Sequence, residues 1–145
     1  MIHLYFIRHG KTQWNHDKKL QGRTNIPLND EGIAQISAYQ FPERLQQLQW
    51  FCSPLIRARQ TAELLGINAS TENRLIEMNW GTWEGRRLKQ LQADDPIGFA
   101  QVEAKGFDLT PPEGESPRLV SERVSQWAEQ LDAMSANQHI GCVSH

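Results

Sequence analysis

The chain has 145 residues, 39% of them hydrophobic, which is enough for one domain with a real core. Its formal net charge is −2 and it has no long run of lysine or arginine, which argues against a general nucleic-acid binder. The first apolar run is too short to cross a bilayer and lacks the basic flank and cleavage site of a signal peptide. Cys52 and Cys142 lie in apolar runs that favour buried, reduced thiols. We therefore expect a cytoplasmic protein with neither a nucleic-acid nor a membrane partner.

A strand and then a helix are predicted at the start of the chain. Residues 2–7 form an apolar run typical of a buried strand. Asn29 or Asp30 suits the N-cap of a helix that continues to about Leu45, although Pro42 should kink or end it.

A second strand and helix follow directly. The strand is predicted over residues 48–52, and Ser53 and Pro54 then supply an N-cap and a first-turn proline. Gly66 is expected to end the helix. Four apolar residues repeat at helical spacing in between: Leu55, Ala58, Ala62 and Leu65.

The remaining sequence is mixed at first and then regular. Short helices are predicted near residues 85–93 and 96–105, with a loop at 110–112, and a third strand covers 139–143. A longer helix begins at Ser116 and Pro117. Its apolar stripe, which we expect to pack on the core, is Val120, Val124, Trp127, Leu131 and Met134. The alternation predicts an α/β fold, a three-layer α/β/α sandwich with a mostly parallel central sheet.

Polar residues follow all three predicted strands. Arg8 and His9 follow the first strand, Ser53 the second, and His145 closely follows the third. Because the carboxyl ends of parallel strands share one sheet edge, we expect Arg8, His9 and His145 to converge there. Arginine offers a fork of donors suited to phosphate, and histidine can act as a nucleophile. Taken alone, however, Arg8, His9 and Gly10 are more often a surface arginine, a capping histidine and a turn.

Arg57 is an independent clue to a bound anion. It lies in the first turn or so of the helix after Ser53, where the positive end of the helix dipole disfavours a cation. A bound anion would reverse that preference, whereas the alternative is an exposed arginine whose stem lies along the surface. Arg59 points elsewhere and is expected to be such a surface residue.

Several short blocks occur in order along the whole chain. They are residues 8–15, 21–22, 27–29, 53–62, 77–85, 114–116 and 143–145. Together these blocks resemble the histidine phosphatase superfamily, which has the phosphoglycerate-mutase-like fold, although no single block is specific. The resemblance implies one histidine-phosphatase domain over residues 1–145.

The resemblance also implies a role for each matching residue. His9 is expected to be the nucleophile that becomes a phosphohistidine. The implied phosphate clamp is Arg8, Arg57 and His145, and the implied supporting donors are Asn15 and the backbone of Gln21 and Gly22. Phosphoryl transfer needs an in-line nucleophile and positive charge around the equatorial oxygens. Two arginines and a second histidine supply that charge, so no metal and no other cofactor is expected.

The leaving alkoxide also needs a proton. Glu77 stands at what resembles the family's general-acid position, and Trp80 and Trp83 are placed to desolvate it and raise its pKa. Glu84 is the competing acid, and its alternative role is that of a structural loop carboxylate. We expect Glu77 to be the acid.

Water is the expected phosphoryl acceptor. Mutases of the resembled family carry basic residues just after the acid and a long insertion before the second histidine. Here Met78 and Asn79 follow Glu77, and the interval to His145 is short. The predicted function is hydrolysis of a small phosphomonoester, with mutase-type transfer as the alternative. Sugar phosphates, phosphoglycerates, α-ribazole phosphate and phosphohistidine on a protein are candidate substrates.

The sequence departs from the family pattern in two places. It stops at His145, whereas family members continue with a further helix and strand. We expect a fragment that lacks the C-terminal elements of the fold, and the alternative is a non-catalytic member that binds anions or partners. Lys11 stands where acidic residues are common, which bears on substrate preference. His3, His16 and His139 match no functional position.

Overall fold

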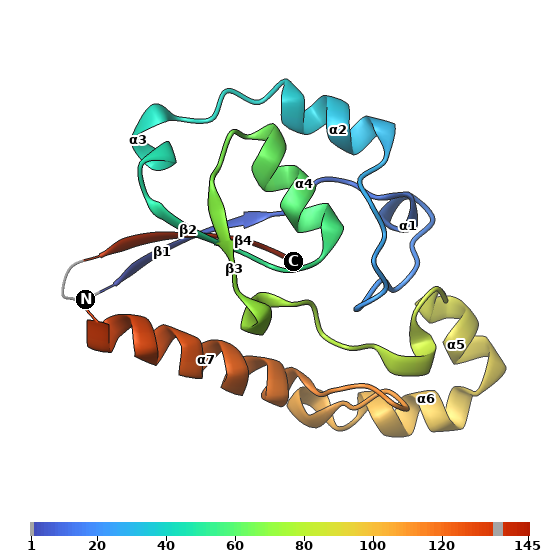
Figure 1. Ribbon diagram of the computed structural model, residues 1–145. Helices are drawn as coiled ribbons and strands as arrows, with labels where there is room; N and C mark the ends of the chain where they lie inside the picture. Colours follow the sequence, from blue (N-terminus) through green and yellow to red (C-terminus); the bar gives the residue numbers. More distant parts are fainter. Residues whose placement is uncertain (1, 135–137) are drawn as a thin grey trace.

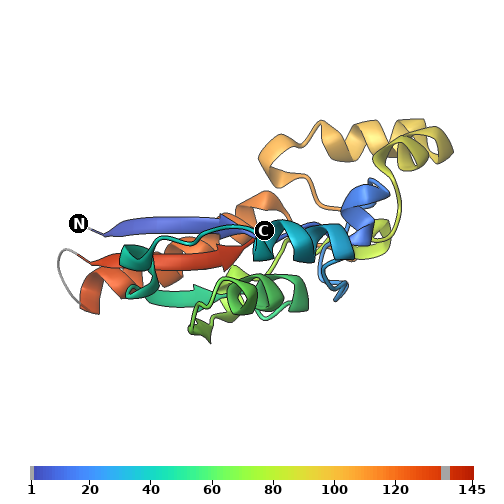
Figure 2. The ribbon, with the colours of Figure 1, turned by 90° about the horizontal axis from the view of Figure 1, so that it is seen from above.

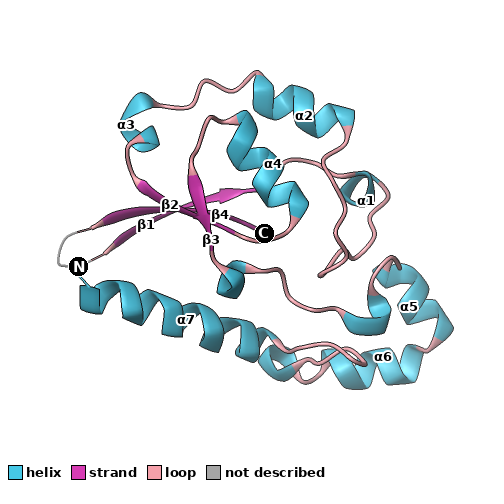
Figure 3. Ribbon diagram, in the orientation of Figure 1, coloured by secondary structure: helices cyan, strands magenta, loops and turns pink. Residues whose placement is uncertain are grey.

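The structure is a computed structural model that describes residues 2–134 and 138–145, and it is built around a four-stranded parallel sheet (Figures 1 and 3). The strands are β1 (His3–Arg8), β2 (Gln49–Cys52), β3 (Ala69–Thr71) and β4 (His139–Ser144). They lie in the order β1-β4-β2-β3, so the last strand in sequence is inserted between the first two.

Helices cover both faces of the sheet, as the predicted three-layer α/β/α sandwich requires. The helices are α1 (Gln13–His16), α2 (Asp30–Ser37), α3 (Glu43–Gln46), α4 (Ile56–Leu64), α5 (Leu88–Asp94), α6 (Pro96–Glu103) and α7 (Pro117–Met134). Three short 3-10 helices span Asn73–Leu75, Gly81–Trp83 and Gly106–Asp108. Figure 1 shows α2 and α4 on one side of the sheet and α7 on the other. Helices α5 and α6 lie beyond the carboxyl ends of the strands (Figure 2). None of the helices in the described residues is long and apolar enough to cross a membrane.

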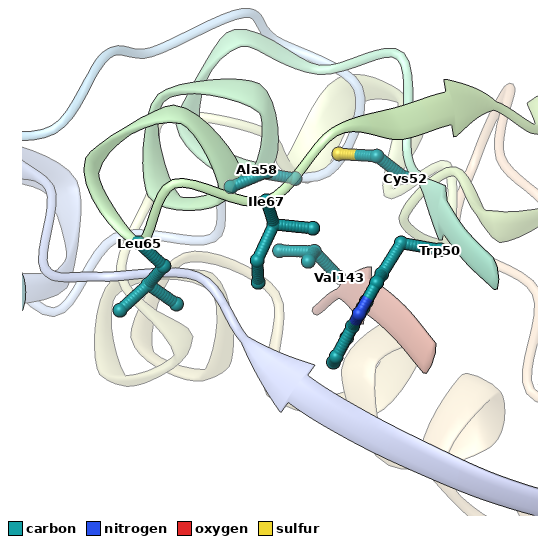
Figure 4. Close-up of a cluster of buried hydrophobic side chains, with 7 residues drawn as sticks. Trp50, Cys52, Ala58, Leu65, Ile67 and Val143 are labelled. Atoms are coloured by element: carbon teal, nitrogen blue, oxygen red, sulfur yellow. The ribbon is translucent and has the colours of Figure 1, made fainter. Parts of the chain in front are cut away.

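Successive side chains of the strands point to opposite faces and form two cores. Trp50, Cys52 and Val143 pack with the buried residues of α4 and with Ile67 on one face (Figure 4). Cys142 packs on the other face with Trp127 of α7. Both cysteines are free and buried, as predicted, and they lie in clusters on opposite sides of the sheet. Of the predicted stripe on α7, Trp127 and Leu131 are buried and Val120 and Val124 half-buried, while the side chain of Met134 lies outside those described.

The helix predicted from Asn29 to Leu45 is in fact two helices. Asn29 is the N-cap of α2, and its side chain accepts a hydrogen bond from the amide of Gly32 at 2.8 Å. This helix ends at Ser37, and Pro42 is the N-cap of α3. A proline has no N–H to donate inside a helix, so it begins a new helix here.

Strand β3 has no strong sequence signal. It has only three residues, pairs with β2 alone and lies at the sheet edge, with Ser70 and Thr71 exposed. Such a short polar segment lacks the apolar run or alternation that marks a strand, so the sequence predicts no strand at residues 69–71.

Candidate active site

His9 follows the last residue of β1 at the carboxyl edge of the sheet. It is 8% exposed, its amide donates to the Ser144 carbonyl at 3.0 Å, and its Nδ1 lies 2.6 Å from the Gly10 carbonyl. Because a carbonyl only accepts, Nδ1 carries the proton and Nε2 keeps its lone pair. Burial lowers the pKa of His9 to about 4. The hydrogen bond to Gly10 opposes this shift, whereas the positive charges of Arg57 and Arg8 add to it. The ring is therefore neutral near pH 7, with a free lone pair on Nε2.

Arg57 is a fully buried cation in the first turn of α4. Its Nη1 donates to the Thr24 carbonyl at 3.0 Å, its Nη2 to the Gly22 carbonyl at 2.7 Å, and its Nε to His145 Nδ1 at 3.3 Å. Burial lowers the pKa of Arg57, whereas nearby carboxylates raise it. These partners, all in the described residues, use three of the five donors of a guanidinium and leave one N–H on each Nη without a partner there.

His145 lies between Arg57 and Ser53. Its Nδ1 accepts from Arg57, so Nε2 carries the proton and donates to the Ser53 hydroxyl at 2.7 Å. Burial, followed by the positive charge of Arg57, lowers the pKa of His145 to about 2. The rings of His9 and His145 have their centroids 5.2 Å apart at an angle of 59°. An oxyanion bound at His9 would therefore lie within reach of both rings.

The predicted N-cap role of Ser53 is wrong. Helix α4 begins at Ile56, and its N-cap is Leu55, which makes no side-chain capping bond. The Ser53 hydroxyl instead accepts from the Leu55 amide at 3.3 Å and meets His145. Ser53 is thus a buried site residue that sequence reasoning assigned to helix capping. The position of Arg57 in the first turn of α4 is unchanged.

Glu77 lies between the first two 3-10 helices and is half-buried. One carboxyl oxygen accepts from the Met78 amide at 2.7 Å. Burial raises the pKa of Glu77, although the Met78 amide and the charges of Arg57 and Arg8 oppose the rise. The charges of Arg57 and Arg8 thus act on Glu77 as well as on His9 and His145.

Glu84 has the environment of a structural carboxylate. One oxygen accepts from the amides of Arg23 at 2.8 Å and Trp80 at 3.2 Å. The other accepts from the amide of Thr24 at 2.9 Å and from its hydroxyl. Gly22 has φ +53°, and a Cβ there would lie 1.9 Å from Glu84, so this close approach needs glycine. Glu84 therefore joins two loops by accepting from four donors, which is the role of a structural carboxylate.

Arg8 is exposed and shares a hollow of about 350 Å³ with His9, Lys11 and Asn15. The Lys11 ammonium pairs with Glu31, so the extra positive charge noted in the sequence is offset locally. The remaining histidines lie elsewhere in the fold. His3 and His139 stack at the amino ends of β1 and β4, with ring centroids 4.6 Å apart, and His16 is exposed at the end of α1.

Thr12 is a site residue that sequence reasoning missed. It is fully buried, and its hydroxyl lies 3.0 Å from the side-chain carbonyl of Asn15 and 2.7 Å from that of Gln21. The Asn15 amide in turn donates to the Thr12 hydroxyl at 3.1 Å, which caps α1. Both amide side chains therefore turn their carbonyls to Thr12 and their NH2 groups away from it. A threonine three residues before an asparagine was the available sequence signal.

A neutral buried histidine beside two arginines, at the carboxyl edge of a parallel sheet, defines a site of the phosphoryl-transfer class. Residues 4–145 match the sequence profile of the histidine phosphatase superfamily (branch 1), and the chain belongs to this family. This confirms the family and the fold expected from the sequence. Members of the family are phosphatases or mutases, which makes an enzymatic role the supported class of function.

Relatives with known names fall into both groups. The chain is 32% identical over 152 residues to a protein named probable phosphoglycerate mutase GpmB in Escherichia coli (strain K12 / DH10B) and in Shigella boydii serotype 18, an alignment that covers 100% of this chain and 70% of the relative. A solved structure described as a "putative alpha-ribazole-5'-P phosphatase" from Escherichia coli K-12 matches with a TM-score of 0.82 and 29% identity, over 98% of this chain and 72% of the other. Phosphoglycerate mutase from Thermus thermophilus matches with a TM-score of 0.77 and 34% identity, over 98% of this chain and 77% of the other.

Proposed function

We propose that the chain is a phosphomonoester hydrolase that works through a phosphohistidine on His9. The observation that carries the proposal is the fixed tautomer of His9: the Gly10 carbonyl holds the proton on Nδ1, and the pKa of about 4 keeps Nε2 unprotonated. Nε2 attacks phosphorus while the bond from phosphorus to the leaving alkoxide breaks, and Glu77 gives its proton to that alkoxide. Water then attacks the phosphohistidine and returns a proton to the Glu77 carboxylate as inorganic phosphate leaves.

The clamp around the transferred group follows from the hydrogen bonds already described. The two unused N–H groups of Arg57 and the guanidinium of Arg8 are assigned to the equatorial oxygens. His145 adds its Nε2 proton, which the Ser53 hydroxyl accepts in the structure. The NH2 groups of Asn15 and Gln21 are assigned as supporting donors. Gly22 contributes its carbonyl to Arg57, and its amide is assigned with that of Gln21 as a further supporting donor.

The reaction is proposed to need no metal, since Arg8 and Arg57 supply fixed positive charge where negative charge develops. Activity on an aryl phosphate should therefore survive exhaustive chelation, and vanadate should inhibit by occupying the clamp. A loss of activity on chelation that a divalent ion restores would contradict this part of the proposal.

Water rather than a second sugar-acid phosphate is proposed as the acceptor. Met78 and Asn79, which follow Glu77, are uncharged, so these two positions offer no positive charge to a substrate carboxylate. The phosphoenzyme should release inorganic phosphate at the same rate with and without added 3-phosphoglycerate. Faster breakdown with formation of phosphorylated glycerate would identify a mutase instead. A small phosphorylated metabolite is the proposed substrate.

Trapping the intermediate tests the proposal directly. A labelled aryl phosphate, quenched with denaturant at alkaline pH, should leave an acid-labile label on the peptide that contains His9. His9→Ala should abolish both label and turnover, while the exposed His16→Ala serves as the matched control. Substantial turnover in His9→Ala would refute the nucleophile assignment.

A further inference from the structure

We propose that Arg123, on α7, is a positioning residue that aims Glu77 at the phosphate site by fixing the main chain on either side of it. The inference rests on the proposed function, because Glu77 as general acid is part of that proposal. It concerns a residue far from the clamp in sequence and in a different layer of the fold.

The guanidinium of Arg123 binds the main chain just before Glu77. Its Nη1 donates to the Arg74 carbonyl, and its Nη2 donates to the Ile76 carbonyl at 2.6 Å. These two carbonyls flank the turn where a 3-10 helix ends and the chain becomes extended at Ile76. One rigid planar group that holds both carbonyls fixes the direction in which the chain enters Glu77.

Glu115 extends this hold to the main chain after Glu77. Its Oε1 accepts from Arg123 Nη2 at 3.0 Å and from the Asn79 amide at 3.0 Å. The Glu115 amide in turn donates to the Asn79 carbonyl at 2.9 Å. The side chains of Arg123 and Glu115 therefore bind two peptide carbonyls before Glu77 and one peptide amide after it.

Burial makes this pair a rigid support rather than a surface ion pair. The side chains of Arg123 and Glu115 are 17% and 13% exposed. Burial alone would raise the pKa of Glu115, but the bonds from Arg123 and Asn79 hold it below its ordinary value. Arg123 Nε is buried with no partner among the described residues, which is unfavourable. The side chain keeps this position because of the contacts that its two Nη groups make.

Arg123 acts on Glu77 through charge as well as through geometry. Its charge lowers the pKa of Glu77, in opposition to the larger effect of burial. Lysine at this position keeps the charge but loses the fork that spans two carbonyls, whereas glutamine loses both. The two substitutions therefore separate the effect of Arg123 on the position of Glu77 from the effect of its charge on the pKa of Glu77.

The test compares an alkyl phosphate, whose poor leaving group needs the acid, with an activated aryl phosphate, which does not. Arg123→Lys should lower kcat/KM for the alkyl phosphate by about tenfold or more and for the aryl phosphate by less than about threefold, since general acids contribute roughly 10²–10⁴-fold. Inhibition by vanadate should not change, because the clamp is intact. Arg123→Gln should in addition move the alkaline limb of the pH profile upward. Arg118→Lys is the matched control, since Arg118 is an exposed arginine of the same helix that pairs with Asp108.

A double-mutant cycle links the effect to Glu77. Once Glu77→Gln has removed the acid, adding Arg123→Lys should cost little more, because the two residues act through one proton. Additive losses, or equal losses for both substrates with a lowered melting temperature, would show a merely structural role and overturn the inference. If Arg123→Lys folds poorly, Glu115→Asp, which keeps the charge but shortens the reach to Arg123 and the Asn79 amide, supplies the same comparison from the other half of the pair. Glu77→Gln alone reports on the proposed acid, so a failure of that assignment is distinguishable from a failure of the positioning role.

Discussion

The environments of two side chains set the pH range in which the proposed chemistry runs. His9 must be neutral to attack, and its pKa of about 4 means that its nucleophilic form is lost only as the pH falls through that value. Glu77 must be protonated to donate, and burial raises its pKa, so the acid form persists to higher pH than for an exposed glutamate. Between these limits both residues are in the state that the first step requires.

We therefore expect a bell-shaped dependence of kcat/KM on pH, with an acidic limb from His9 and an alkaline limb from Glu77. Glu77→Gln should remove the alkaline limb and slow alkyl phosphates by roughly 10²–10⁴-fold, with a smaller effect on aryl phosphates. The profile must be corrected for the substrate phosphate, which ionises near pH 6. Glu84→Gln is the control and should lower stability without leaving-group selectivity. Selective slowing in Glu84→Gln alone would move the acid to Glu84.

Arg57 is the residue at which a conservative change should be most damaging. Lysine keeps the charge but cannot hold the carbonyls of Gly22 and Thr24 while reaching His145 and an anion. Arg57→Lys should lower kcat/KM by about 100-fold or more and destabilise the fold by about 2 kcal/mol. Arg59→Lys, on the exposed face of α4, should change neither quantity appreciably. Activity and urea unfolding of both variants check the prediction, and equal behaviour of the two would contradict it.

At the level of elements, the sequence is informative wherever a local pattern is strong. The apolar runs locate β1, β2 and β4, and the parallel pairing then places Arg8 opposite Ser144 at one edge. His9 and His145 could be predicted to meet for this reason alone. The contact of the Ser53 hydroxyl with His145 could not be predicted in this way. Serine has a local preference for helix N-caps, and here a contact with a residue distant in sequence outweighs that preference. Thr12 and Arg123 were missed for the same reason, since their partners are fixed by tertiary packing.

Strand β4 depends on a glycine at its centre. The Trp50 ring lies directly over Gly141, held there by a hydrogen bond of 2.7 Å from its Nε1 to the Leu45 carbonyl. A Cβ at position 141 would lie 2.2 Å from Trp50 Cδ2, which the buried ring cannot relieve without moving. Overpacking of this kind typically costs about 1–3 kcal/mol, so Gly141→Ala should destabilise the fold by at least about 2 kcal/mol. Thermal unfolding of Gly141→Ala measures this loss, with Gln49→Ala at an exposed position of β2 as the control. An unchanged melting temperature in Gly141→Ala would show that the Trp50 ring is not fixed.

For the whole molecule, the site is a source of acid sensitivity. His9 and His145 are buried neutral in the folded state, with pKa values of about 4 and about 2, against an ordinary value of 6.5 in the unfolded chain. Their contribution to stability is therefore fully present above pH 6.5 and is lost as the pH falls toward the folded-state values. Glu77 has the opposite sign, because its raised pKa makes the folded state bind a proton that the unfolded chain releases above pH 4.5.

Between about pH 5 and 6, unfolding should therefore take up roughly 1.5–1.9 protons at the histidines and release at most one from Glu77. Each net proton corresponds to a slope of about 1.4 kcal/mol per pH unit, so the free energy of unfolding should rise with pH by at least roughly half that amount per unit. Glu77→Gln removes the opposing proton and should steepen the slope, whereas His9→Gln should reduce it by about one proton. Urea midpoints measured across this range provide the slopes. A flat or falling stability across this range, unaffected by His9→Gln, would mean that the two histidines are not held neutral in the folded protein.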